Sequence, residues 1–485
     1  MTSLPQGTAN DNANAPYDIE PEIAALAAAL RRAVDKVAPG EGFGVREAEA
    51  LRLSNEMVRR LLQQDLQDLA SSHGDKDLLI DGELHRPHQP GTVTYHSLVG
   101  PLPTTRWSYR PVGERNAPTV VPLELAAGLM ERATPALSSC LAAGLARGGS
   151  RDVVEDMEAS HRLPPSRSTI ERIGHRLGDA VIKAVEVLEP TVRAKEQLPD
   201  DIRAVSVGLD RTSAPMEEDL VEPPHRKPRK KPYVRTPPDP VQVCHRMTYV
   251  GTVALHGPDD DSLQTYRYFA SAEEGPEGIL RRMMDDVRRV RAERRNLPVL
   301  VIQDGAPEMW NRVTEALEDE PTIHTWHEVL DRYHLDERLA DVAKVLAEGN
   351  ESEAREIRSG WCNLLNTDDD GISVIHREIE LSLNDGFTGQ AYDTLHETHT
   401  YISNNHERMR YATFRTRGLP IGSGITEAAC KTMVMQRAKR SGQRWRPDGL
   451  QAVMALRTQL LNLRLGPYLS LLHDTEYSAE VKVAA

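Results

Sequence analysis

Two aspartates follow hydrophobic runs that have the pattern of buried strands. Asp210 ends the run "IRAVSVGLD" (202–210), and Asp304 comes near the end of "LPVLVIQDG" (297–305). A carboxylate that leaves the end of a buried strand lies at the edge of a sheet, where the sites of α/β proteins gather. If the two strands are neighbours, the two carboxylates come close together in a partly dry place. Taken singly, each aspartate also suits an Asx turn or a cap at a strand end.

A third carboxylate, Glu427, stands at the start of a helix-like stretch that ends in a dense block of cations, "IGSGITEAACKTMVMQRAKRSGQRWR" (421–446). Glu427 can pair with Lys431 one turn later, but such a pair stabilises a helix by only about 0.2–0.5 kcal/mol. Carboxylates that converge raise a pKa or recruit a divalent cation. Three of them suffice to hold two Mg²⁺ ions for phosphoryl transfer. We therefore expect a metal site formed by Asp210, Asp304 and Glu427.

The charge of the chain is unevenly distributed. The net charge is −14, which taken alone argues against nucleic acid as a partner. Yet residues 403–446 hold ten Lys/Arg against two acids, and "HRKPRKKPYVR" (225–235) holds six cations and no acid. Such segregation lets a basic face bind a polyanion, although a solvated surface is the other interpretation. The side chains that we expect to contact DNA in these segments are Lys230, Lys231, Lys431, Arg437, Lys439, Arg440, Arg444 and Trp445, the last either stacked on an unpaired base or packed in the protein.

A pair of helices is predicted before the strands. "SRDVVEDMEAS" (150–160) is separated by "HRLPP" from "SRSTIERIGHRLGDAVIKAVEVL" (166–188). A short helix, a tight turn and a second helix make a helix-turn-helix candidate, in which Arg167, Arg172 and Arg176 would meet DNA. A helical hairpin within a bundle is the alternative.

The strands follow Pro199 in the order β-β-β-α-β-α-β. Three strands in meander before the first long helix favour a mixed sheet flanked by helices over a doubly wound parallel sheet. Residues 213–240 are proline-rich and charged, and they predict a loop directly after the first strand. Residues 335–415 have an almost entirely helical pattern, which predicts a helical domain set into the fold.

Four stretches of the chain resemble a known family. "VSVGLDRT", "LVIQDGAPEMW", "VLDRYHLDERL" and "GLPIGSGITEAACKTMVMQRAKRSGQRW…ALRTQLL" are similar to the ISKra-type insertion-sequence transposases, prokaryotic DDE enzymes related to the Mutator-like group. The resemblance covers roughly residues 120–465, and G-S-G-x-x-E…R-x-K-x-S-G-x-x-W is its most specific part. It implies an RNase H-like core with a helical insertion between the second Asp and the Glu. By position it implies Asp210, Asp304 and Glu427 as the triad, and "DRYH" adds Asp331 and His334 as catalytic candidates.

The resemblance also implies a reaction and its partners. The triad would hold two Mg²⁺ or Mn²⁺ ions for cleavage at the ends of the element and strand transfer to target DNA. His334 would orient the scissile phosphate or a water, unless it is a structural histidine. The partners would be double-stranded DNA, both terminal inverted repeats and target, and a second copy of the chain. A nuclease of the same fold that does not rejoin strands and an inactive DNA-binding derivative are the alternatives.

The sequence departs from the family near its N-terminal β-rich stretch. Relatives often carry cysteine pairs there, whereas this chain has no cysteine before Cys140. His85 and His88 are too few to hold a structural zinc ion, so none is predicted.

The totals fit a cytoplasmic protein, and the resemblance implies a prokaryotic one that is associated with the nucleoid. Hydrophobic residues make up 39% and charged residues 27% of 485, with no apolar run long enough to span a membrane and no signal peptide pattern. The four cysteines form no CxxC pair, which fits a reducing cytosol. The fold class is α/β, a mixed-sheet core with a helical insertion. The predicted parts are a disordered lead (1–19), a helical and small β module (20–120), a helical helix-turn-helix region (121–195), the first part of the core (196–335), a helical insertion (336–415), C-terminal core helices (416–470) and a tail (471–485).

Overall fold

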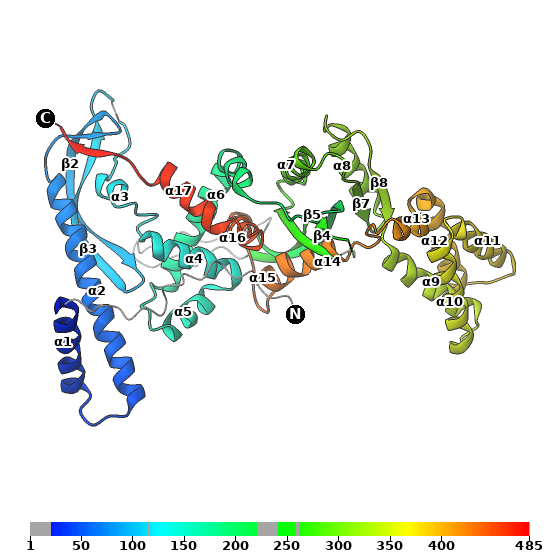
Figure 1. Cartoon of the computed structure of the whole chain (residues 1–485), viewed down its shortest axis with the longest axis horizontal. Coiled ribbons are helices and arrows are strands. Elements are labelled where there is room, and N and C mark those ends of the chain that lie inside the picture. The colour runs from blue at the N-terminus through cyan, green and yellow to red at the C-terminus, as the bar shows by residue number, and fades with distance from the viewer. Residues whose placement is uncertain (1–20, 115, 221–240, 259–260, 485) are drawn as a thin grey trace, which may run out of the picture. The chain divides into compact units, whose positions relative to one another are not determined.

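A computed structural model of the chain divides into two compact units (Figure 1). The residues it describes are 21–114, 116–220, 241–258 and 261–484. The predicted disordered lead and the basic stretch 225–235, with Lys230 and Lys231, lie outside them. Unit 1 takes in the described residues of 1–137, 151–167 and 478–485, and unit 2 those of 138–150 and 168–477.

Unit 1 joins a helical hairpin to a small antiparallel sheet. Its elements are α1 (Pro21–Val37), α2 (Phe43–His73), β1 (Leu78–Ile80), β2 (Glu83–Ser97), β3 (Gly100–Pro111), α3 (Pro122–Ala126), most of α5 (Ser150–Ala159) and β9 (Val481–Val483). The strand order is β3-β2-β1-β9. Gln67 ties α2 to β3, because its side chain both donates to the Thr105 carbonyl and accepts from the Thr105 N–H at 3.0 Å. Helices and strands thus lie where the sequence predicts them between residues 20 and 120.

The end of the chain differs from its predicted tail. Residues 471–485 contain the end of α17 and strand β9, in which Lys482 pairs with Leu79 of β1. A three-residue strand is too short to give a periodic signal in the sequence, so its pairing could not be predicted.

Unit 2 holds the larger sheet and most of the helices. Its elements are most of α4 (Pro135–Arg147), α6 (Arg167–Lys195), β4 (Ala204–Asp219), β5 (Val241–His256), β6 (Ser262–Ala270), α7 (Glu277–Glu293), β7 (Val299–Gln303), α8 (Pro307–Glu318), β8 (His327–Leu330), α9 (Arg332–Leu346), α10 (Glu351–Thr367), α11 (Gly371–Asn384), α12 (Gln390–Asn405), η1 (His406–Arg408), α13 (Tyr411–Thr416), α14 (Gly424–Cys430), the π-helical turn η2 (Lys431–Met435), α15 (Gln436–Ala438), α16 (Pro447–Leu461) and α17 (Leu465–Glu476).

The sheet of unit 2 is mixed. Its strand order is β6-β5-β4-β7-β8, with the first three strands antiparallel and β4, β7 and β8 parallel. The meander followed by α7, β7, α8 and β8 confirms the predicted order of elements. This arrangement is compatible with the RNase H-like core that the family resemblance implies.

The first strand is longer than predicted. β4 continues nine residues beyond Asp210 to Asp219 and pairs with β5 along its whole length. Asp210 therefore lies within a strand, opposite Val250, and the loop predicted to start at residue 213 is strand as far as Asp219. The predicted loop is wrong for residues 213–219. The segment "DRTSAPMEED" (210–219) is mostly polar and shows no strand pattern, but its pairing with β5 keeps the backbone extended. On the other side of β4, pairing with β7 ends at Val207.

The two faces of β4 pack against different helices. Val207 and Leu209 belong to the main core, which also contains the buried apolar residues of α7. Successive side chains of a strand point to opposite faces, so Gly208 and Asp210 face the other way. On that face Ala214 and Val250 form a second core with residues from α14 to α16.

Two predicted subdivisions remain predictions. Residues 336–415 are helical from α9 to α13, but their buried side chains, among them Trp361, Ile375 and Ile402, belong to the same core as the sheet. The helix pair predicted as helix-turn-helix corresponds to α5 and α6, which fall mainly in different units. No helix among the described residues is long and apolar enough to cross a membrane.

Candidate active site

Two acidic residues follow adjacent parallel strands. Asp304 follows β7 and Asp331 follows β8, and the register pairs Gln303 with Leu330 immediately before them. The Asp331 N–H continues the ladder by donating to the Gln303 carbonyl at 2.8 Å. Both carboxylates therefore leave the same end of the sheet, which is where sites in open α/β sheets are found.

Asp210 lies on β4 just beyond its last pair with β7. Beyond Val207, where the backbone pairing of β4 with β7 ends, the two strands are joined by the Gln303 side chain, whose Oε1 accepts from the Leu209 N–H at 3.3 Å. The Asp210 side chain is half-buried and accepts from the Arg211 N–H at 2.6 Å and from Cys430 Sγ at 3.3 Å. Burial raises the pKa of Asp210; the two hydrogen bonds oppose this, and the negative charge of Asp304 adds to it.

Asp304 is exposed and makes a local turn. Its Oδ1 accepts from the Ala306 N–H at 3.1 Å, which is the Asx turn considered from the sequence. The same carboxylate acts electrostatically on Asp210 and on His334. Asp304 therefore forms a local turn and also contributes negative charge to the surroundings of Asp210 and His334.

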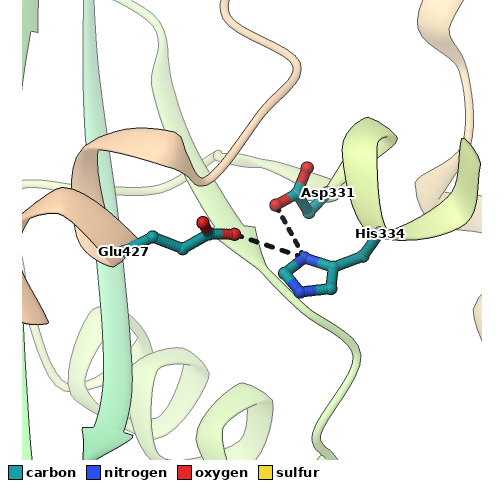
Figure 2. Close-up of side chains that lie close together, drawn as sticks. All are labelled: Asp331, His334 and Glu427. Atoms are coloured by element: carbon teal, nitrogen blue, oxygen red, sulfur yellow. Dashed lines mark hydrogen bonds and ion pairs between the residues drawn. The ribbon is translucent and has the colours of Figure 1, made fainter. Parts of the chain in front are cut away.

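Asp331, His334 and Glu427 form a close cluster (Figure 2). Asp331 is fully buried and caps α9, because its Oδ1 accepts from the Tyr333 N–H at 2.8 Å. Its Oδ2 accepts from the Ser423 hydroxyl and lies 3.0 Å from His334 Nδ1. The same nitrogen lies 3.6 Å from Glu427 Oε1.

His334 is held between these carboxylates with its ring partly open to solvent. Burial alone would lower its pKa, but the hydrogen bond to Asp331 and the charges of Asp331, Glu427 and Asp304 together raise the pKa above its usual value. With Nδ1–H donating to Asp331, Nε2 is the ring atom that can meet a ligand. The site therefore contains an imidazole that tends to be protonated, beside several carboxylates.

The segment before Glu427 is fastened to the end of β8. The Arg332 N–H donates to the Ile421 carbonyl at 3.0 Å, next to the bond between Ser423 and Asp331. Gly422 lies so close to Tyr333 that a Cβ would come within 2.6 Å of its ring. The glycine before the helix thus permits the close backbone approach on which the position of Glu427 depends.

The donor set suits a divalent cation, although the three predicted ligands do not form one close group. Among the described residues, the potential ligand atoms that lie within 4.8 Å of one another are those of Asp331, His334 and Glu427. Asp210 and Asp304 are not in this group. Both oxygens of Asp331 already accept from protein donors, so Asp331 is better suited to orient His334 than to bind a cation. The acidic oxygens of Asp210, Asp304 and Glu427 are ligands of the type that Mg²⁺ prefers.

Two residues predicted to contact DNA are packed inside unit 2. Arg437 is 2% exposed, donates from Nε to the Leu145 carbonyl at 2.7 Å and lies over the Trp445 ring. Trp445 donates from Nε1 to the Ala438 carbonyl at 2.9 Å, and its backbone joins Pro215 and Glu217 of β4. In this structure Arg437 therefore cannot reach a phosphate, and Trp445 takes the packing role. The prediction for Arg437 is wrong because a buried arginine and an exposed one look alike in a basic run.

The other predicted DNA contacts are distributed over the surface of their units. Lys431, Arg440, Arg444, Arg167 and Arg176 are exposed, and Lys439 and Arg172 are half-buried. Arg444 lies 3.8 Å from Glu217. No ion pair joins Glu427 to Lys431 in the part of the chain that the structure describes; the ion-pair partner of Glu427 is His334.

Comparison with known proteins adds little. No family model and no curated protein matches the chain. One match among solved structures is the Mos1 transposase paired-end complex with left transposon end, at 12% identity and a TM-score of 0.16, covering 56% of this chain and 75% of that chain. So low a score supports neither fold nor function, and the resemblance to ISKra-type transposases stays a prediction.

Three contributors to the site were missed from the sequence. Cys430 contacts Asp210, Ser423 donates to Asp331, and Gln303 bridges β4 and β7. Only the position of Gln303, directly before a strand-end aspartate, was a usable signal. All three contacts join residues far apart in the chain.

Proposed function

We propose that this chain is a DDE-type DNA transposase of a prokaryotic insertion sequence. The observation that carries the proposal is that His334 lies 3.6 Å from Glu427 beside the end of β8, while the charges of Asp304 and His334 act on Asp210, in a sheet whose strand order is compatible with an RNase H-like core. The basic residues Lys431, Arg440 and Arg444 follow Glu427 in the chain and suit a phosphate backbone.

Asp210, Asp304 and Glu427 are the residues that would hold the divalent ions. When bound, Mg²⁺ or Mn²⁺ supplies activation of a water and neutralisation of the charge that develops on the transferred phosphoryl group. Glu427 is reachable, since its side chain is 41% exposed, and the half-buried Asp210 lies where the β4–β7 ladder has ended. The small thiol of Cys430 holds one oxygen of Asp210 in place.

His334 is proposed to bind the scissile phosphate. Its raised pKa favours the imidazolium form, which attracts an anion, and Asp331 fixes the ring through Nδ1 so that Nε2 is presented outward. Asp331 acts as a positioning residue, because its own oxygens are occupied by Tyr333, His334 and Ser423.

The test uses the full chain and duplexes containing the inverted repeats that flank its gene. With Mg²⁺ we expect cleavage at the repeat ends and joining of a tagged 3′ end to a plasmid. Asp304→Asn should abolish both steps while the variant still binds the duplex. Cleavage without joining would identify the nuclease alternative, and full cleavage by Asp210→Asn together with Glu427→Gln would overturn the triad.

A further inference from the structure

Glu427 is carried by a very short helix that something must hold in place. α14 has seven residues and passes directly into the π-helical turn η2. A short helix has few contacts to fix its rotation, and one residue of slippage turns a side chain by about 100°. The position of Glu427 relative to Asp210 therefore depends on what α14 touches on the sheet.

Thr426, the residue before Glu427, is seated on Gly208 of β4. A Cβ at Gly208 would clash with Thr426 Oγ1 and would lie 3.2 Å from Thr426 Cβ. The φ of Gly208 is not in the left-handed region, so glycine is required there for space rather than for backbone conformation. The missing side chain forms a socket that is two residues before Asp210 and on the same face of the strand.

Thr252 closes the socket from the neighbouring strand. It is the β5 partner of Gly208, and its Oγ1 lies 2.8 Å from Thr426 Oγ1. Both threonines are buried, at 2% and 6% exposure. A buried hydroxyl pair is directional, whereas apolar packing alone would permit rotation.

A second contact lies one helical turn further along. Cys430 follows Thr426 by four residues, so it lies on the same face of α14, and its Sγ is 3.3 Å from Asp210 Oδ2. Thr426 and Cys430 thus face β4, while Glu427, between them, lies toward His334.

We propose that Gly208, Thr252 and Thr426 form a positioning lock that sets the rotation and height of α14, and with them the distance of Glu427 from Asp210. The inference rests on the proposed function, because the consequence of the lock is the geometry of the metal-binding carboxylates. Gly208, Thr252 and Thr426 are buried, so we assign each a positioning role.

The experiment measures Mn²⁺ binding by electron paramagnetic resonance on the full chain, together with thermal unfolding and cleavage of the inverted-repeat duplex. Thr426→Val removes the hydroxyl at constant shape and should weaken Mn²⁺ binding about 10-fold, the lower end of the effect of outer-shell partners. Thr426→Ser should retain binding. The matched control is Thr432→Val, since the Thr432 hydroxyl of η2 donates to the Ala428 carbonyl one turn earlier, in α14, at 2.8 Å and not to the sheet; this variant should bind Mn²⁺ as wild type does.

Two double variants separate positioning from simple stability. Thr426→Val alone leaves the buried hydroxyl of Thr252 without its partner and should lower the unfolding temperature. Adding Thr252→Val replaces this second hydroxyl by an apolar group, so the unfolding temperature of the double variant should be closer to that of wild type, while its Mn²⁺ binding stays weak. Gly208→Ala should weaken binding through the clash with Thr426, and adding Thr426→Ala should recover part of it, since the hydroxyl oxygen is gone.

The outcomes distinguish the lock from the proposed function. If the Thr252→Val, Thr426→Val pair recovers both stability and Mn²⁺ affinity, or if Thr426→Val binds like the Thr432→Val control, the lock is overturned. If wild type and Glu427→Gln bind Mn²⁺ equally poorly and neither cleaves, the proposed function fails instead. Should Gly208→Ala not fold, the hydroxyl variants still decide.

Discussion

The stretch 421–446 has two halves that differ in charge and in their structural environment. Residues 421–433 hold one acid, Glu427, and one cation, Lys431, whereas residues 434–446 hold five cations and no acid. In the first half, α14 carries a single carboxylate, Glu427, to the end of the sheet, where it meets His334 and remains 41% exposed. In the second half, Arg437 is buried under Trp445, and Arg446 is paired with Asp219 at 3.0 Å. The carboxylate of Glu427 can thus still bind a ligand, while Arg437 and Arg446 already have partners within the protein.

The difference shows that burial and partners, rather than residue type, separate a working charge from a structural one. Glu427 has a partner that is itself part of the site, whereas the partner of Arg437 is a backbone carbonyl of α4. Substitutions in the two halves should therefore have opposite signatures in activity and stability.

The largest effect is expected from Glu427→Gln. Losing a metal ligand removes several kcal/mol of charge stabilisation, so cleavage should fall about 10³-fold or more. The unfolding temperature should change little, because the side chain is partly exposed. Measurements are initial cleavage rates and thermal denaturation, with Glu407→Gln as an exposed control; a stability loss with retained cleavage would reverse the comparison.

A smaller but still large effect is expected at the histidine. His334→Gln should slow cleavage by about 10²-fold, the low end for a group acting on a reacting phosphate. Asp331→Asn should slow cleavage less. It should also lower the free energy of unfolding by about 1–3 kcal/mol, because a buried hydrogen-bonded charge is lost. Single-turnover cleavage and urea denaturation separate the two. Equal stability of both variants would contradict the positioning role of Asp331.

Arg437→Met should show the signature opposite to that of Glu427→Gln. The Leu145 carbonyl loses its buried donor, so the free energy of unfolding should fall by about 1–3 kcal/mol. Cleavage per folded molecule should stay near wild type. Arg444→Met, an exposed residue of the same half, is the matched control for urea denaturation; an unchanged stability of Arg437→Met would show that its burial has no energetic weight.

The smallest effect is expected from the exposed cations. Lys431→Ala with Lys439→Ala should weaken duplex binding at every sequence. The dependence of log affinity on log salt should fall by about 0.9 for each DNA phosphate that the variant no longer neutralises. Arg446→Ala should change that dependence less, because Arg446 already pairs with Asp219. A salt titration of fluorescence anisotropy makes the comparison; equal effects per removed charge would show that the ion pair of Arg446 makes no difference to DNA binding.

The sequence predicts the layers of this fold better than it predicts the contacts of the site. Continuous apolar runs such as 299–302 mark buried strands, so the order of the mixed sheet follows from local pattern. The polar continuation of β4 to Asp219 does not, because its pairing with β5 is non-local. Contacts such as Cys430 with Asp210, or Arg437 with Leu145, join residues hundreds of positions apart and depend on packing that no local spacing encodes.

The most direct test is a crystal structure of the chain soaked with Mn²⁺, with the ion located by anomalous scattering. We expect density between Asp210, Asp304 and Glu427, with Asp331 keeping its bonds to Tyr333 and His334. Density bound instead by Asp331, His334 and Glu427, with Asp210 and Asp304 uninvolved, would contradict the triad on which the proposed function depends.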